Sequence, residues 1–128
     1  MTDSARGYVL DTSALAALAT SHEMSLLVSN APYLDWRLFA PVTCLEAADR
    51  IRPGIARHIG RIPSVETVDL TYAAVVDLRR RSPDVALDVA HVISLAQPTE
   101  EWPNGLIVTT VLPDLYEGQR LRIYPVGD

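Results

Sequence analysis

The stretch Tyr8–Leu15, with the sequence YVLDTSAL, decides the fold of this 128-residue chain. Three apolar residues lead to Asp11, and two hydroxyl residues then precede an apolar helical run. This order predicts a buried strand over 7–11 and a helix over 13–20. Ligands of open α/β sheets bind at the carboxyl ends of the strands. We therefore expect Asp11 to place its carboxylate in a ligand crevice.

The rest of the chain alternates between short apolar strands and helical segments. The predicted strands cover 38–40, 65–70, 106–109 and 121–124, and the predicted helices cover 23–29, 42–51, 53–59, 71–81 and 83–96. Glycine and proline gather between Gln97 and Gly105, which predicts a loop. The alternation indicates one α/β domain over 1–128, with a mostly parallel central sheet flanked by helices.

The basic residues of the chain are all arginine, and lysine is absent. A P-loop needs a lysine on the phosphates and a Schiff-base enzyme needs a lysine amine, so both classes are excluded. The formal net charge of −5 argues against a broadly basic nucleic-acid binder. It does not exclude a nuclease, because bound cations offset acidic residues. The arginines at 50, 52, 57 and 61 and at 79–81 could hold phosphates, although solvated helix faces are the favoured reading.

No apolar run approaches the roughly 18 residues that a membrane span needs. The polar segment 1–7 lacks the pattern of a signal peptide. The single cysteine, Cys44, excludes an internal disulfide and fits a reducing compartment. Its apolar helical setting favours a core residue over a nucleophile. We expect a cytoplasmic protein that does not enter membranes.

Two further acids stand on apolar helical runs, Glu46 in the sequence VTCLEAA and Asp88 in the sequence ALDVAH. We expect both side chains to meet Asp11 at one end of the sheet and to form a Mg²⁺ site, because Mg²⁺ prefers oxygen ligands. Asp11 and Asp88 are the candidate direct ligands, and Glu46 either orients a water or acts as general base. The alternative is that Asp11 caps a helix and that Asp88, with Asp84, complements a helix dipole.

Four segments in this order resemble the PIN-domain ribonucleases, most closely the VapC-type toxins of bacterial toxin–antitoxin pairs. They are VLDTSAL at 9–15, PVTCLE at 41–46, LDVAHV at 87–92 and IVTT at 107–110. The resemblance extends over essentially the whole chain.

This resemblance implies a PIN-like three-layer sandwich and a Mg²⁺- or Mn²⁺-dependent endoribonuclease that acts on RNA. It also implies a homodimer held inactive by a cognate antitoxin protein. Asp11 matches the first acid of the family, Glu46 the second and Asp88 the third. These three residues are therefore the expected catalytic and metal-binding groups.

The chain departs from the family at the fourth acid, which commonly lies two residues beyond the threonine of the fourth strand. Counted from Thr109, this position is Val111, and a shift by one lands on Leu112. Asp114 lies nearby, but Pro113-Asp114 also fits a type I turn, which we favour. The missing acid leaves a second hypothesis, a PIN-like binding or regulatory module without turnover.

The remaining polar and aromatic candidates each have a structural alternative. Ser13 and Thr109 would contact phosphate or support the acids in the family picture, and local backbone hydrogen bonding explains them equally well. Packing is favoured over metal binding for His91 and over base stacking for Trp36 and Trp102.

Overall fold

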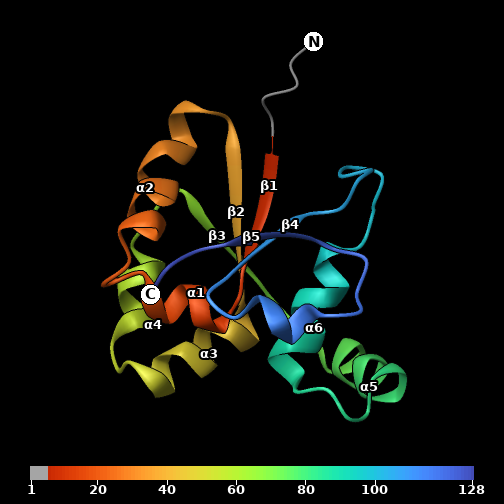
Figure 1. Ribbon diagram of the computed structural model, residues 1–128. Helices are drawn as coiled ribbons and strands as arrows, with labels where there is room; N and C mark the ends of the chain where they lie inside the picture. The colour runs from red at the N-terminus through yellow and green to blue at the C-terminus, as the bar shows by residue number, and fades with distance from the viewer. Residues whose placement is uncertain (1–5) are drawn as a thin grey trace.

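A computed structural model describes residues 6–128, which form a five-stranded sheet flanked by helices (Figure 1). All strands are parallel, in the order β3-β2-β1-β4-β5. The strands are β1 (Arg6–Leu10), β2 (Trp36–Pro41), β3 (Val65–Val68), β4 (Ile107–Thr110) and β5 (Arg122–Pro125). The helices are α1 (Thr12–Ala17), α2 (His22–Asn30), α3 (Val42–Ile51), α4 (Ile55–Gly60), α5 (Tyr72–Arg81) and α6 (Leu87–Ala96), with short 3-10 turns η1 (Ala31–Tyr33) and η2 (Pro113–Tyr116).

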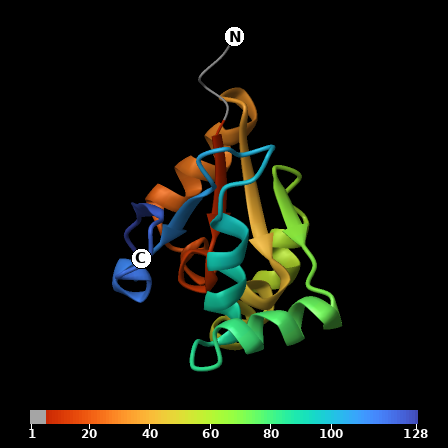
Figure 2. The same cartoon turned by 90° about the vertical axis from the view of Figure 1, so that its right-hand side faces the viewer.

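The elements form three layers. Helices α1 to α4 lie on one side of the sheet, and α5 and α6 lie on the other (Figure 1). From the α5 side, α6 crosses in front of the central strands (Figure 2). The predicted α/β sandwich is therefore confirmed, and its sheet is entirely parallel.

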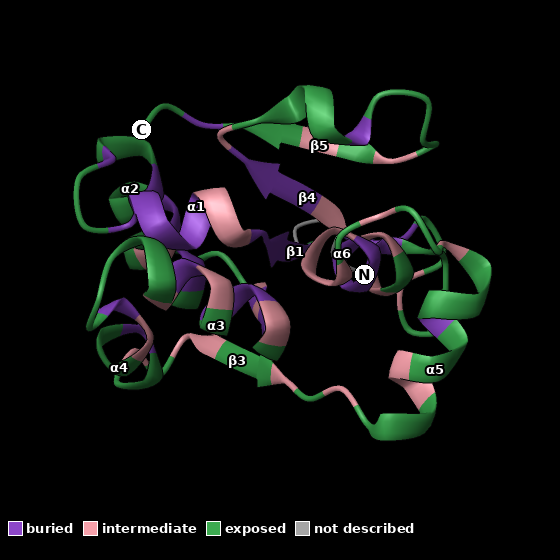
Figure 3. Cartoon of the chain, turned by 90° about the horizontal axis from the view of Figure 1, so that it is seen from below, coloured by how far each residue is buried: buried purple, intermediate pink, exposed green. Residues whose placement is uncertain are grey.

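The central strand β1 and its neighbour β4 are the most completely buried strands. Four of the five residues of β1 are buried, as are three of the four residues of β4. Helices cover both faces of these strands, which explains their continuous apolar runs. Seen from the carboxyl end of the sheet, the buried ends of β1 and β4 lie among α1, α3 and α6 (Figure 3). This end of the sheet therefore brings helix starts and strand ends together.

The start of α6 corrects one prediction. The sequence predicted a helix over 83–96, but the helix begins at Leu87. Pro83 and Asp84 instead occupy a turn in which the Val85 amide donates to the Ser82 carbonyl at 3.3 Å, a setting that suits proline. Ala86 then has extended backbone with ψ of 143°, so helical geometry cannot pass through it.

The other boundaries differ less. α3 has the predicted bounds, whereas α1, α4 and β3 end or begin within a few residues of the predicted positions. The polar N-terminal segment was predicted over 1–7, and its residues 1–5 lie outside the described part of the chain. None of the helices in residues 6–128 has the length and apolar character needed to cross a membrane.

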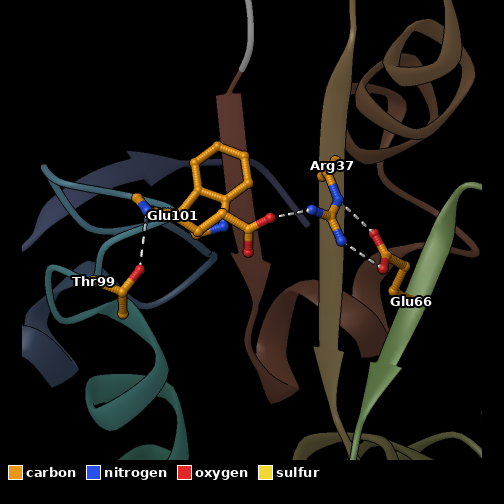
Figure 4. Close-up of polar contacts among 5 residues, drawn as sticks. Arg37, Glu66, Thr99 and Glu101 are labelled. Carbon is orange, nitrogen blue, oxygen red and sulfur yellow. Dashed lines mark hydrogen bonds and ion pairs between the residues drawn. The ribbon is translucent and has the colours of Figure 1, made fainter.

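Arg37 joins the loop before β4 to the sheet by hydrogen bonds. Arg37 on β2 forms two hydrogen bonds of 2.9 Å with Glu66 on β3 and one of 2.9 Å with Glu101 in the loop (Figure 4). Its guanidinium lies 5.0 Å from the centre of the Phe39 ring and 6.0 Å from that of Trp102. We call these five residues the Arg37 cluster.

Candidate functional site

Asp11 lies between β1 and α1 and is the N-cap residue of α1. Its side chain is 3% exposed, and Oδ1 accepts hydrogen bonds from the Ala14 amide at 2.9 Å and the Ser13 hydroxyl at 2.7 Å. The predicted capping role is therefore real, because the Ala14 bond satisfies an amide at the open end of the helix. It occupies only one oxygen of the carboxylate, so capping does not exclude a second role.

Asp88 reaches the same place from the first turn of α6. The Thr12 hydroxyl donates to its Oδ2 at 2.6 Å, which links the start of α1 to the start of α6. Asp11 and Asp88 line one cavity of about 280 Å³. Its other walls come from Thr12, Ser13, Cys44, Ile51, Ala86, Val89, Leu112, Leu115 and Tyr116. We call it the carboxylate cavity.

Tyr116, which the sequence analysis did not single out, contacts Asp11 directly. Its hydroxyl donates to Asp11 Oδ2 at 2.8 Å, and the residue is 3% exposed. Burial raises the pKa of this phenol, and the nearby Asp11 charge raises it further, so the hydroxyl keeps its proton and remains a donor. The only sequence signal was a tyrosine in an otherwise exposed turn after β4.

A row of hydroxyl groups supports Asp11 from the other side. Ser13 Oγ lies 3.1 Å from Thr110 Oγ1 and accepts a hydrogen bond from the Val111 amide at 2.9 Å. Ser13 therefore supports the acid, one of the two roles expected for it. Thr109 is different: its side chain is fully buried, and its Oγ1 has no hydrogen-bond partner among residues 6–128. The hydroxyl next to Ser13 thus belongs to Thr110, which the sequence analysis passed over.

Glu46 lies outside the carboxylate cavity. It projects from α3 with 64% of its side chain exposed and pairs with Arg50 at 2.9 Å. A second hollow of about 480 Å³ is lined by both Glu46 and Asp88, together with Arg50 and Arg79. Asp88 therefore stands between the two hollows. Within the described part of the chain, no three acidic, histidine or cysteine side chains form a group that could hold a metal ion.

The fourth-acid region offers no carboxylate to the cavity. Leu112, Leu115 and Tyr116 line it, whereas Asp114 in η2 is exposed and is not among the lining residues. The Leu115 amide donates to the Leu112 carbonyl at 3.1 Å, which is the hydrogen bond of the favoured turn with Pro113 and Asp114 at its centre.

The remaining candidates have packing roles. Burial raises the pKa of the Cys44 thiol to about 12, so this side chain is a core residue that borders the cavity. His91 is 2% exposed, and its Nδ1 lies 2.8 Å from the Thr43 hydroxyl. A helix over 83–96 would have placed Asp84, Asp88 and His91 on one face, but Asp84 precedes the observed helix and does not share a helical face with His91. Trp36 and Trp102 are partly buried against the core.

The donor set of the carboxylate cavity fits a hard divalent cation. Oδ2 of Asp11 accepts one hydroxyl, and Oδ1 of Asp88 accepts no hydrogen bond from residues 6–128, so each acid keeps lone pairs for a further partner. Mg²⁺ takes one or two carboxylates and completes its shell with water. Two aspartates in an open cavity meet that requirement without a third protein ligand.

The chain was also compared with known proteins. No protein-family model matches it, and no curated protein matches it either.

Proposed function

We propose that this chain is a Mg²⁺-dependent endoribonuclease of the PIN type. One observation carries the proposal: Asp11 and Asp88, 77 positions apart in the sequence, line the same cavity at the carboxyl end of a parallel sheet. This is where open α/β folds bind their ligands. The motif order that resembles PIN ribonucleases supports RNA as the substrate. Mn²⁺ is an alternative cofactor of the same coordination chemistry.

The residues of the chain divide the work as follows. The Ala14 amide and the hydroxyls of Ser13 and Tyr116 hold the Asp11 carboxylate in one orientation. Asp11 and Asp88 would bind the cation together. When bound, Mg²⁺ would lower the pKa of a water and offset charge on the scissile phosphate.

Glu46 would orient the attacking water or take its proton, from the hollow that it shares with Asp88. For either role, the Glu46 carboxylate must first break its ion pair with Arg50. An exposed i,i+4 ion pair of this kind contributes only about 0.3–0.5 kcal/mol, so the move costs little. Arg50 and Arg79 line the same hollow and would then face the RNA backbone.

The physiological setting rests on the resemblance. We propose a cytoplasmic toxin that forms a homodimer and is held inactive by a cognate antitoxin.

A second candidate is a binding or regulatory module without turnover. It is favoured because residues 6–128 bring no third acid to the carboxylate cavity, and because Val111 stands at the position of the fourth acid. Such a module would bind a cation or RNA and cut nothing.

The test is cleavage of a panel of structured RNAs by the purified protein in Mg²⁺, in Mn²⁺ and in EDTA, with Asp11→Asn in parallel. The proposal predicts metal-dependent cutting that the variant lacks. If no RNA is cut while Mg²⁺ still raises the melting temperature, the second candidate replaces the first. Equal cutting by the variant would remove Asp11 from the mechanism.

A further inference from the structure

A third hollow lies on one face of the sheet, toward the amino ends of its strands. It has a volume of about 310 Å³ and is lined chiefly by Arg6, Tyr8, Trp36, Ile107, Arg122 and Tyr124. It shares no lining residue with the carboxylate cavity. Arg6 begins β1 and Asp11 directly follows its last residue, five positions later, which corresponds to about 16 Å at 3.3 Å per residue. We call it the arginine hollow.

Strand register explains why these side chains meet. Arg6 is paired with Trp36, and Ile107 is paired with both Tyr8 and Arg122. Paired residues of neighbouring strands point to the same face, as do residues two apart on one strand. The arginines, the tryptophan and the tyrosines therefore all project from one face of β2, β1, β4 and β5.

The two arginines give the hollow positive charge. Among residues 6–128 neither forms an ion pair, in contrast to Arg37, Arg50 and Arg81. Arg122 donates to the Gly105 carbonyl at 2.6 Å, and Arg6 lies 5.5 Å from the centre of the Trp36 ring. No acidic side chain of residues 6–128 lines this hollow, so both guanidiniums can accept an anionic ligand there, and guanidiniums bind phosphate well.

Three aromatic residues, Tyr8, Trp36 and Tyr124, also line the hollow. The Tyr8 ring centre lies 5.5 Å from that of Trp36 and 6.1 Å from that of Tyr124. Tyr8 is buried, but Tyr124 is 41% exposed and offers a ring to a ligand. Aromatic rings beside a basic surface are the features with which proteins bind single strands, since every base has a face that can stack.

The geometry points to a binding site for single-stranded RNA in the arginine hollow, where Arg6 and Arg122 take the phosphates and a base stacks on Tyr124. The volume is at the lower end of that of small-ligand sites and suits about one nucleotide. This inference rests on the proposed function for the choice of RNA. The inference adds a second RNA contact to the proposed nuclease, remote from the carboxylates. This contact would make the enzyme prefer substrates with an unpaired segment.

The test is fluorescence anisotropy with a labelled ten-nucleotide oligouridine in EDTA, on the Asp11→Asn background so that no cutting occurs. Arg122→Gln should weaken binding by about tenfold and should reduce the slope of log affinity against log salt by about one. Tyr124→Leu should weaken binding by at least about fivefold. Arg120→Gln, an exposed arginine two residues before Arg122, is the matched control and should bind normally.

Circular dichroism and the melting temperature show whether each variant folds. If Arg122→Gln does not fold, the affinity of Tyr124→Leu tests the inference instead. Unchanged affinity in a folded Arg122→Gln or Tyr124→Leu protein overturns the inference. Competition by inorganic phosphate as strong as that by the oligonucleotide also overturns it, because the site would then bind only an anion. Binding here is independent of cleavage, so failure of the proposed nuclease and failure of this site are distinguishable.

Discussion

At the scale of single residues, Asp11 has two roles that a sequence pattern presents as alternatives. One oxygen caps α1 through the Ala14 amide, and the other accepts the Tyr116 hydroxyl. The capping bond spans three residues and follows from local preferences. The Tyr116 bond joins residues 105 positions apart, and no local pattern encodes such a contact.

Replacing Tyr116 with phenylalanine should therefore destabilise the protein. The change removes a buried donor to a carboxylate, and hydrogen bonds to charged groups contribute about 1.5–3 kcal/mol. Urea unfolding at neutral pH measures the loss of unfolding free energy. Tyr72→Phe, at a tyrosine that is 85% exposed, is the control and should have no effect. A Tyr116→Phe protein as stable as the wild type would mean that the Asp11 contact is not formed in solution.

At the scale of elements, the junction of α3 and α6 determines where Asp88 lies. The Thr43 hydroxyl bonds to His91 Nδ1 at 2.8 Å, and the Cys44 thiol donates to the Asp88 carbonyl at 3.6 Å. The bounds of α3 could be predicted because its apolar residues recur at helical spacing. The start of α6 could not, because a proline opens helices and turns alike.

Burial of His91 predicts a dependence of stability on pH. Desolvation lowers the pKa of this side chain below its ordinary value of 6.5, so the unfolded chain binds more protons than the folded one. The unfolding free energy should therefore fall as the pH drops through 6.5, and the His91 contribution should level off below the folded-state pKa.

The check is urea unfolding between about pH 5 and pH 7. The variant His91→Gln can still bond to Thr43 and should give a shallower slope than the wild type, whereas His58→Gln, at an exposed histidine, should keep the wild-type slope. Equal slopes for His91→Gln and the wild type would show that His91 titrates normally.

The Arg37 cluster also acts between elements, because its hydrogen bonds join β2, β3 and the loop before β4. The hydrogen bonds from Arg37 lower the pKa of Glu66 below its ordinary value of 4.5. The contribution of the Arg37–Glu66 pair to the unfolding free energy is therefore full above pH 4.5 and is lost as the pH falls through the lowered pKa. Lysine cannot reproduce the paired contact or the stacking on Phe39.

Arg37→Lys should lower the unfolding free energy by roughly 1 kcal/mol at low salt and by less at high salt, because the acids are half exposed. Urea midpoints at two salt concentrations measure this difference. Arg80→Lys, at an exposed arginine of α5, serves as the control. A loss that does not change with salt would show that packing on the rings, rather than charge, holds the loop.

At the scale of the whole molecule, the sheet carries two hollows of opposite character. The carboxylate cavity lies at the carboxyl ends of the strands, and the arginine hollow lies toward their amino ends. The alternation of strands and helices predicted the parallel sheet, and the strand-end position predicted where Asp11 lies.

The exposure of Glu46 and the position of the arginine hollow depend on three-dimensional packing and could not be predicted from the sequence. Glu46 stands on an apolar helix, yet it lies on the exposed face of that helix because Cys44, Leu45 and Ala48 take the buried positions. The arginine hollow depends on the register of four strands, which short apolar runs do not specify.

The measurement that tests the central claim most directly is RNA cleavage in Mg²⁺ by two matched variants of the same loop and helix. Asp88→Asn removes a carboxylate from the cavity, whereas Asp84→Asn removes one from the exposed turn four residues before it. We predict that Asp88→Asn loses more than about a hundredfold in rate, because a ligand should matter more than the outer groups of a metal site do. Asp84→Asn should cut like the wild type. Equal rates for the wild type and a folded Asp88→Asn protein would contradict the account.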